Sequence, residues 1–440
     1  MIEKSKIEKI KNILLWVIVM YILNKGLCDW ATLGVSKIVY YSVIAASAMF
    51  GMINLFFKKS TRVIVILFGA YALISLINGV CLSNWEQFRV GVIQYITYPL
   101  PFFALSYLMG EKKDFSKLLY GIVIWGAVTS LLAMYEYFSL QSILPGFEEI
   151  YYKYQNGTVV YRATVYIGSP LFLGVLLGAA LIVASFLFYR KRKWWILATT
   201  PLIFAGILCT GSRGPLLCSV GGIVVMFGTI AIQNGISKRL RKIMGIVGVT
   251  AAVCVVILFA VPNLSTGNEQ IDFFIYRFTS AFDFKTEWGN LERLKRWTYY
   301  LGLFMEQPMF GYGLASTSAM VKSNQMVTSH GITTESGILG RLVESGIVGT
   351  LAYYLFLSAC IWKGFKGICK RENRRTETRY MVIGIIALLL VEDIILQVSL
   401  DIFCNFLMWF VLAYALNQTM DGKEKFIQHP IIDGIKKIGL

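Results

Sequence analysis

Apolar stretches of membrane-spanning length recur along the whole chain, separated by short clusters of charged residues. A mostly apolar run of about 20 residues is long enough to cross a bilayer as a helix. The pattern predicts an all-α polytopic integral membrane protein with about 12 transmembrane helices. The predicted spans are 12–28, 36–57, 63–82, 90–109, 118–138, 167–189, 194–209, 215–233, 243–261, 337–362, 380–400 and 402–418.

The basic residues predict the orientation of these spans. Of the 42 Lys and Arg residues, 29 lie in the termini and in every second connection. Cytoplasmic connections are enriched in Lys and Arg. Both termini and the basic connections are therefore expected in the cytoplasm, and the intervening connections outside it.

Two of the connections expected outside are long, 139–166 and 262–336. Loops of this length within a compact protein are usually functional. The predicted organisation has three parts. Residues 1–261 hold spans one to nine, 262–336 form a large external loop with an amphipathic helix, and 337–440 hold the last three spans and a cytoplasmic tail.

Composition narrows the class of protein. The chain is 56% hydrophobic and only 15% charged, with a formal net charge of +17. A soluble domain carries roughly 25% charged residues, so a soluble enzyme and a disordered chain are excluded. Nucleic acid is not an expected partner, because the basic residues are spread between apolar runs and not gathered on one domain. No metal and no cofactor is expected, since no external His, Asp or Glu cluster has ligand spacing.

The segment 291–305 in the large loop has helical apolar spacing. Arg293, Arg296 and Tyr300 lie three and four positions apart and share one helix face. The helix could lie at the interface with its arginines on lipid headgroups. Alternatively, the arginines form an anion site facing a cavity, because the guanidinium fork suits phosphate.

Arg213 lies in a turn, Thr210-Gly-Ser-Arg-Gly-Pro215, between two close spans on the external side. A charged residue at membrane depth tends to face a cavity or a partner. Snorkelling to the interface is the alternative. The functional role is favoured, because Gly211 and Gly214 allow a ligand to approach closely. Arg162 precedes the sixth span and is predicted on the same side.

One histidine, His330, is predicted outside the membrane, and it is the candidate general base. A loop histidine without a role is the alternative. Glu335 competes with it as a base, and Glu344 is a second carboxylate nearby. Arg341 could pair with one of these two acids.

Glu392 and Asp393 interrupt the eleventh predicted span, and Asp401 follows at its end. Acids within the membrane usually pair with a base or line a polar cavity. We expect one of them to hold a catalytic arginine in place. A proton or ion relay is the rival explanation.

Several of these segments resemble the O-antigen ligase and polymerase superfamily of bacterial membrane glycosyltransferases, the Wzy and WaaL type. The turn Gly211-Ser-Arg-Gly-Pro-Leu-Leu217 is similar to the family's SRG segment. Arg293 and Trp297 followed by Gln307-Pro-Met-Phe-Gly-Tyr-Gly-Leu314 are similar to its "R…W, E-x-P-x-x-G-x-G" stretch. Glu344-Ser-Gly-Ile-Val-Gly349 is similar to its "E-x-G-x-x-G" stretch. Arg162 fits the arginine that the family has just before the span that follows its first external loop.

The resemblance implies a GT-C-like fold in the bacterial cytoplasmic (inner) membrane. It also implies a donor glycan on polyprenyl diphosphate and a glycan acceptor, with a chain-length regulator as a further partner. Arg213 and Arg293, with Arg162, would bind the diphosphate, and His330 or Glu335 would accept the proton of the acceptor hydroxyl. Transfer would invert the anomeric carbon. Arg296, Tyr300 and Glu344 are expected to contact substrate.

Ligases of this family have His-Asn about nine residues before the glutamate of the E-x-G-x-x-G stretch. Here Glu335 occupies that spacing. This departure favours a polysaccharide polymerase over a ligase that transfers the glycan to lipid A-core or another acceptor. A flippase or transporter of lipid-linked glycans is the alternative from another class, but transport does not require the large external loop.

Overall fold

The protein is described here by a computed structural model, which covers residues 2–110, 115–144, 151–153, 159–235, 288–318, 334–366 and 377–419, with three isolated positions between 235 and 288. Nearly all of this is helical. The longer helices are α1 (Ile2–Leu23), α3 (Val35–Phe57), α4 (Arg62–Leu82), α6 (Leu100–Met109), α7 (Ser116–Ser139), α8 (Pro170–Lys191), α9 (Trp194–Cys209), α10 (Arg213–Asn234), α13 (Trp288–Glu306), α14 (Gly337–Phe365), α15 (Glu377–Ile395) and α16 (Ile402–Thr419). The short elements are α2 (Lys25–Ala31), α5 (Trp85–Gly91), the π-helix η1 (Val92–Thr97), the 3₁₀ helix η4 (Val398–Leu400) and the strands β1 (Tyr151–Lys153) and β2 (Val159–Tyr161).

Eleven of the twelve predicted spans coincide with helices, and 243–261 lies outside the described residues. Within the described part of the chain, seven helices are long and apolar enough to cross a membrane. The α1–α2 pair, bent by 93°, would be an eighth, and α9 and α16 are shorter apolar helices. The prediction of an all-α polytopic membrane protein is therefore confirmed. The predicted loop 139–166 adds one small feature, the antiparallel β1–β2 hairpin.

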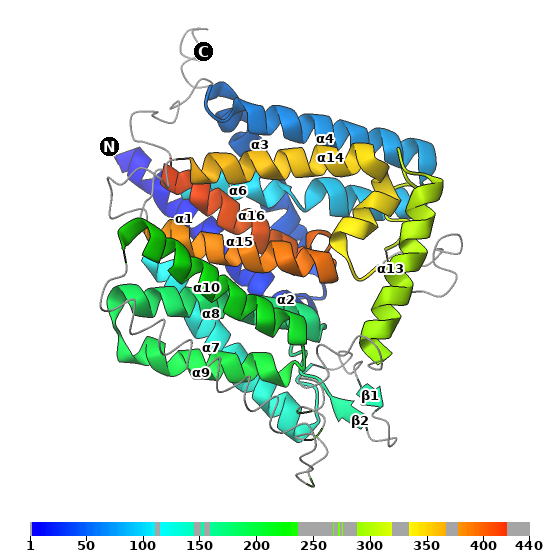
Figure 1. The fold of residues 1–440 in the computed structure, drawn as a ribbon. Helices are drawn as coiled ribbons and strands as arrows, with labels where there is room; N and C mark the ends of the chain where they lie inside the picture. The colour runs from blue at the N-terminus through cyan, green and yellow to red at the C-terminus, as the bar shows by residue number, and fades with distance from the viewer. Residues whose placement is uncertain are drawn as a thin grey trace.

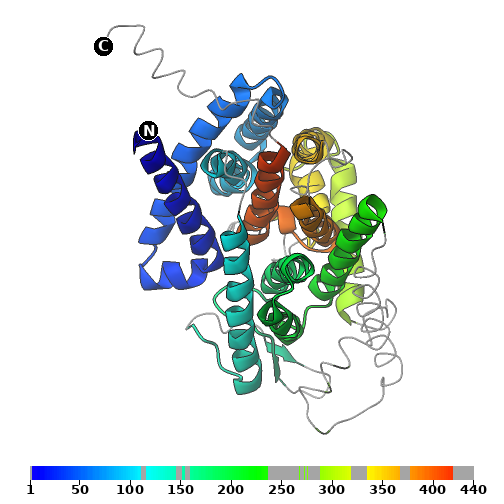
Figure 2. The same ribbon diagram turned by 90° about the vertical axis from the view of Figure 1, so that its left-hand side faces the viewer.

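The spans lie side by side, and α13 crosses their ends (Figure 1). We call this the α13 end of the bundle. Viewed along the spans, α8, α15 and α16 lie towards the middle, and α13 passes behind α15 and α10 (Figure 2). The helices that pack most extensively are α10 with α15, α3 with α6, α8 with α9, and α4 with α14.

Aromatic packing fills the centre of the bundle. The fully buried Trp409 ring stacks on Phe356, with 5.0 Å between ring centroids, and Phe102 meets it edge-on. The outward faces of the spans carry exposed large apolar residues, such as Val80 and Leu351. In water such surfaces would be unfavourable, but in a bilayer they face lipid chains of similar polarity.

Two spans are interrupted. The span Trp85–Met109 contains the π-helix η1, which buries Gln94 and Tyr95. Within α14, Gly346 has φ +61° and ψ −168°, so the helix is broken there. Single-turn π-helices and broken helices within a membrane often mark functional regions. Both interruptions border the cluster of polar residues described next.

Candidate active site

Two arginines of α13 bind one carboxylate at the α13 end. Arg293 Nε lies 3.0 Å from Glu335 Oε2, and Arg296 Nη1 lies 2.7 Å from Glu335 Oε1. Arg296 also reaches Glu292, at 3.4 Å. Glu335 is in the left-handed region, with φ +48°, immediately before α14 begins. Three residues predicted for the site are thus brought together, and both oxygens of Glu335 accept hydrogen bonds from guanidinium groups.

Arg162 is held against the turn that precedes Arg213. Its Nε donates to the Thr210 carbonyl at 2.7 Å, and its Nη2 donates to Ser212 Oγ at 2.6 Å. Gly211, with φ +58°, packs against the Arg162 side chain. Arg162 therefore fixes the end of α9 and the start of α10, where Arg213 is the first residue.

Glu392 of α15 lies beside the start of α10. A Cβ atom at Gly214 would stand 2.9 Å from Glu392 Oε1. Glu392 is only 1% exposed, and among the described residues its Oε1 has no hydrogen-bond partner. The Arg293 guanidinium is close enough to Glu392 to interact with it electrostatically. This buried acid therefore lies beside the turn of Arg213, and its expected role of positioning an arginine stays a prediction.

Glu344 is fully buried and saturated with hydrogen bonds. Its carboxylate accepts from Tyr95 Oη at 2.7 Å, from the Ala315 amide at 3.1 Å, and from both the amide and hydroxyl of Thr317 at 3.1 and 2.6 Å. Its contacts tie η1 and the segment 311–318 to α14. The predicted contact of Glu344 with substrate stays a prediction.

The P-x-x-G-x-G and E-x-G-x-x-G stretches form one structural unit. The amide of Tyr312 donates to the Val343 carbonyl at 2.8 Å, and the amide of Ile347 donates to the Pro308 carbonyl at 2.8 Å. A Cβ atom at Gly346 would collide with the Met309 backbone. The segment 308–313 therefore satisfies the backbone groups that the break in α14 leaves without helical partners.

Arg341 does not pair with Glu335 or Glu344, so that prediction is wrong for the described structure. Its guanidinium stacks on Tyr353, 3.6 Å from the ring centroid, and donates to Tyr71 and to the Ser399 hydroxyl and carbonyl. The Ser399 amide in turn donates to Asp393 at 2.8 Å. Tyr95 lies between this arginine and Glu344, since its ring faces the guanidinium at 4.9 Å and its hydroxyl donates to the Glu344 carboxylate.

Sequence reasoning missed Glu136 of α7. This fully buried carboxylate accepts from the amides of Thr164 and Val165, at 2.9 and 2.7 Å, and from Ile143 at 2.9 Å. It fixes the loop that follows Arg162. A lone acid close to the end of the predicted span 118–138 was the signal available in the sequence.

The structure places some of the remaining predicted residues but not others. His330 lies outside the described residues. Tyr300 is 1% exposed and packs against Val343, and this burial raises the pKa of its phenol. In the described part of the chain, no three His, Cys, Asp or Glu side chains gather in a way that could hold a metal ion.

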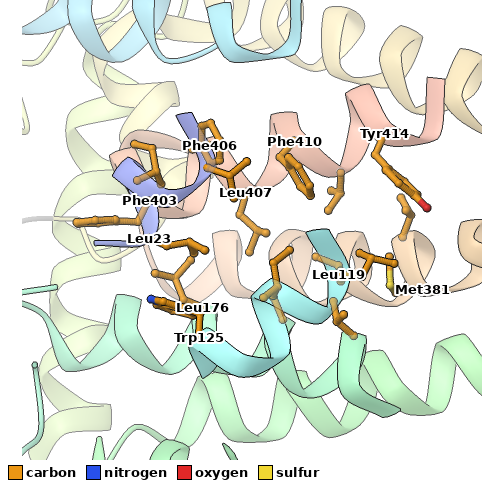
Figure 3. Close-up of a pocket in the computed structure, with 18 residues that line it drawn as sticks. Leu23, Leu119, Trp125, Leu176, Met381, Phe403, Phe406, Leu407, Phe410 and Tyr414 are labelled. Carbon is orange, nitrogen blue, oxygen red and sulfur yellow. The ribbon is translucent and has the colours of Figure 1, made fainter. Parts of the chain in front are cut away.

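A narrow apolar crevice runs along the bundle between α1, α7, α8, α15 and α16 (Figure 3). Phe403, Phe406, Phe410 and Tyr414 line it in succession along α16. From Phe403 to Tyr414 a helix rises about 16 Å. Trp125 lines the α7 wall, one turn from Thr129, whose hydroxyl pairs with Tyr166 Oη at 2.7 Å. The crevice therefore adjoins the loop that carries Arg162.

Residues 198–354 match the family model described as O-antigen ligase. The match begins in α9 and ends in α14, so it includes Arg213, the Arg293–Glu335–Arg296 cluster and the broken helix at Gly346. No curated protein matches the chain.

Proposed function

Because its O-antigen ligase domain assigns this chain to the O-antigen ligase/polymerase superfamily, we propose that it transfers a glycan from polyprenyl diphosphate to an acceptor sugar hydroxyl, as an inverting, metal-independent polysaccharide polymerase. The observation that carries the proposal is the pair of arginines, Arg293 and Arg296, that binds one carboxylate, Glu335. We further propose that the α13 end faces the outside of the bacterial cytoplasmic membrane.

The arginines bind the donor diphosphate. Guanidinium groups donate paired hydrogen bonds to phosphate oxygens and stay charged at all physiological pH values. Arg213 is the first residue of α10. The Ser212 side chain does not cap this helix, because its hydroxyl contacts Arg162. The positive end of the helix dipole then favours the anion. The role of Arg162 is indirect, because it holds this turn in place.

Glu335 serves as the counter-ion of the two α13 arginines while the donor is absent. Both oxygens of Glu335 accept hydrogen bonds from guanidinium groups, so neither is free to take a proton from the acceptor hydroxyl. This leaves His330 as the proposed general base. The arriving diphosphate replaces Glu335 on the guanidinium groups, and no positive charge is left without a partner.

The transfer is a single displacement. The acceptor hydroxyl oxygen attacks the anomeric carbon of the donor sugar as His330 takes its proton. The bond between that carbon and the diphosphate oxygen breaks, and the electron pair leaves with the diphosphate. Arg213 and Arg293 stabilise the charge that develops there, and such stabilisation is strongest in a dry, preorganised site. One displacement inverts the configuration at the anomeric carbon.

The apolar crevice suits the donor's polyprenyl tail. Its lining is almost entirely aliphatic and aromatic, and its Trp125 wall adjoins the loop of Arg162. Contact of the tail with this lining would help to hold the lipid while the diphosphate lies at the α13 end.

The glycan profile of the native host tests the proposal. After deletion of the gene, surface glycan and carrier-linked glycan are resolved on a gel and blotted. A polymerase predicts collapse of the ladder to one repeat unit that is still attached to its usual anchor. Long chains that persist on the polyprenyl carrier would instead identify a ligase, and an unchanged profile would favour the flippase alternative.

A further inference from the structure

Helix α13 carries an apolar stripe that faces away from the protein. Leu294, Leu301 and Met305 are 43%, 51% and 69% exposed and lie seven and four residues apart, which is the spacing of one helix face. Tyr300, on the opposite side, is buried against α14, and Arg296 binds Glu335. The inward side of the helix therefore combines the arginines with an apolar contact to α14, and the stripe lies on the outward side.

The stripe continues onto the apolar sides of the spans. Met309 and Phe310 follow α13 and are also exposed. The amide of Val348 donates to the Met309 carbonyl at 3.2 Å, which brings this turn against α14. Leu351 and Leu355, one and two turns further along α14, are exposed apolar residues as well. One apolar surface therefore extends from the spans onto α13.

The position of α13 agrees with this continuity. The helix crosses the ends of the spans (Figure 1), and in the view along the spans it passes behind α15 and α10 (Figure 2). Lys295 and Glu306 are exposed on a different side from the stripe. Helices with one apolar face and one charged face lie in the plane of the bilayer interface.

We propose that α13 is an interfacial helix, and that Leu301 and Met305 insert among the phospholipid acyl chains of the leaflet on the α13 side. The lipid that covers α4 and α14 would then also cover the outer face of α13. Arg293 and Arg296, on the inner face, are thereby fixed at the depth of the lipid headgroups. The proposal does not depend on glycan transfer, because it concerns what covers the helix.

Site-specific photocrosslinking of the full chain in lipid nanodiscs tests it. A benzophenone amino acid replaces Leu301 or Met305 in discs of phosphatidylethanolamine and phosphatidylglycerol, and mass spectrometry identifies the adducts after illumination. Position 351 is the control for lipid contact, and position 306 is the control for solvent. We expect phospholipid adducts at 301 and 305 in yields within about threefold of position 351 and roughly tenfold above position 306.

The other outcomes overturn the proposal. Yields at 301 and 305 equal to those at position 306 would show that the stripe faces water. Adducts to a second copy of the chain or to another protein would show that a protein covers it. A second measurement uses Met305→Glu with the photocrosslinker at 301, which should reduce the lipid adduct severalfold, whereas Met305→Ala should not. An equal yield from both variants would also contradict insertion.

Discussion

Gly214 lies directly against Glu392, so closely that a Cβ atom at position 214 would stand 2.9 Å from the Glu392 Oε1 atom. A side chain at this point would push the buried carboxylate away from the start of α10. The contact therefore fixes the position of the Glu392 carboxylate beside the turn of Arg213.

Gly214→Ala is therefore expected to lower glycan transfer by roughly 10- to 100-fold, because small displacements within a catalytic site are costly. The rate is measured with purified protein and a lipid-linked donor. Gly221→Ala, on the same helix, is the matched control, since a Cβ atom there meets open space. Equal activity of the two variants would contradict a role for the Gly214–Glu392 contact.

Loss of either diphosphate-binding arginine should nearly abolish transfer. We expect Arg213→Ala and Arg293→Ala each to reduce the rate by about 10²- to 10³-fold, as removal of a preorganised charge-stabilising donor does. Lys295→Ala, an exposed change on the same helix as Arg293, should leave the rate unchanged. A normal product length from either arginine variant would remove that residue from the mechanism.

Glu335→Gln distinguishes a counter-ion from a base. As a counter-ion, Glu335 competes with the donor for Arg293 and Arg296, so its loss should leave the maximal rate within a few-fold of the native value. Loss of a general base lowers the rate by about 10²- to 10⁴-fold, and we expect that loss from His330→Ala. A collapse of the rate in Glu335→Gln with a normal rate in His330→Ala would reverse the two assignments.

Glu344→Gln should destabilise the protein by about 1–3 kcal/mol, because the amide group that replaces one carboxylate oxygen cannot accept the hydrogen bonds made there. Tyr95→Phe removes one donor and should cost about 1 kcal/mol. Thermal unfolding in detergent measures both. A Glu344→Gln variant as stable as the native protein, but inactive, would indicate that this acid contacts substrate.

Gly346→Ala should prevent stable folding or lower the melting temperature sharply. The substituted residue would have to keep a positive φ and would collide with the Met309 backbone. Gly69→Ala in α4 meets nothing within 4 Å and lies in a regular helix, so it should be neutral or slightly stabilising. Similar melting temperatures for the two variants would be evidence against a fixed break in α14.

Hydropathy predicted the spans well because a bilayer imposes a length and a polarity on each helix separately. The bend at Asn24 and the break at Gly346 were not predicted, since neither changes the apolar character of its segment. The backbone of residues 308–313 supplies the hydrogen bonds that the helix lacks at Gly346. Hydropathy carries no information about that pairing.

The sequence predicted which residues belong to the candidate site, but not which of them contact each other. Arg293 and Glu335 were both singled out, yet their ion pair joins positions 42 residues apart, and no local pattern specifies such a contact. Arg341 was expected to meet an acid and instead lies on a tyrosine ring. Glu136 was not predicted, because its hydrogen-bond partners are backbone amides, which occur all along every chain.

The break at Gly346 also imposes an order on biogenesis. The first turns of α14 complete their hydrogen bonding with residues 308–313, which leave the ribosome earlier. A span with unpaired backbone groups is poorly tolerated in a hydrocarbon environment. The break in α14 is therefore stable in the membrane only once the segment 308–313 has packed against it.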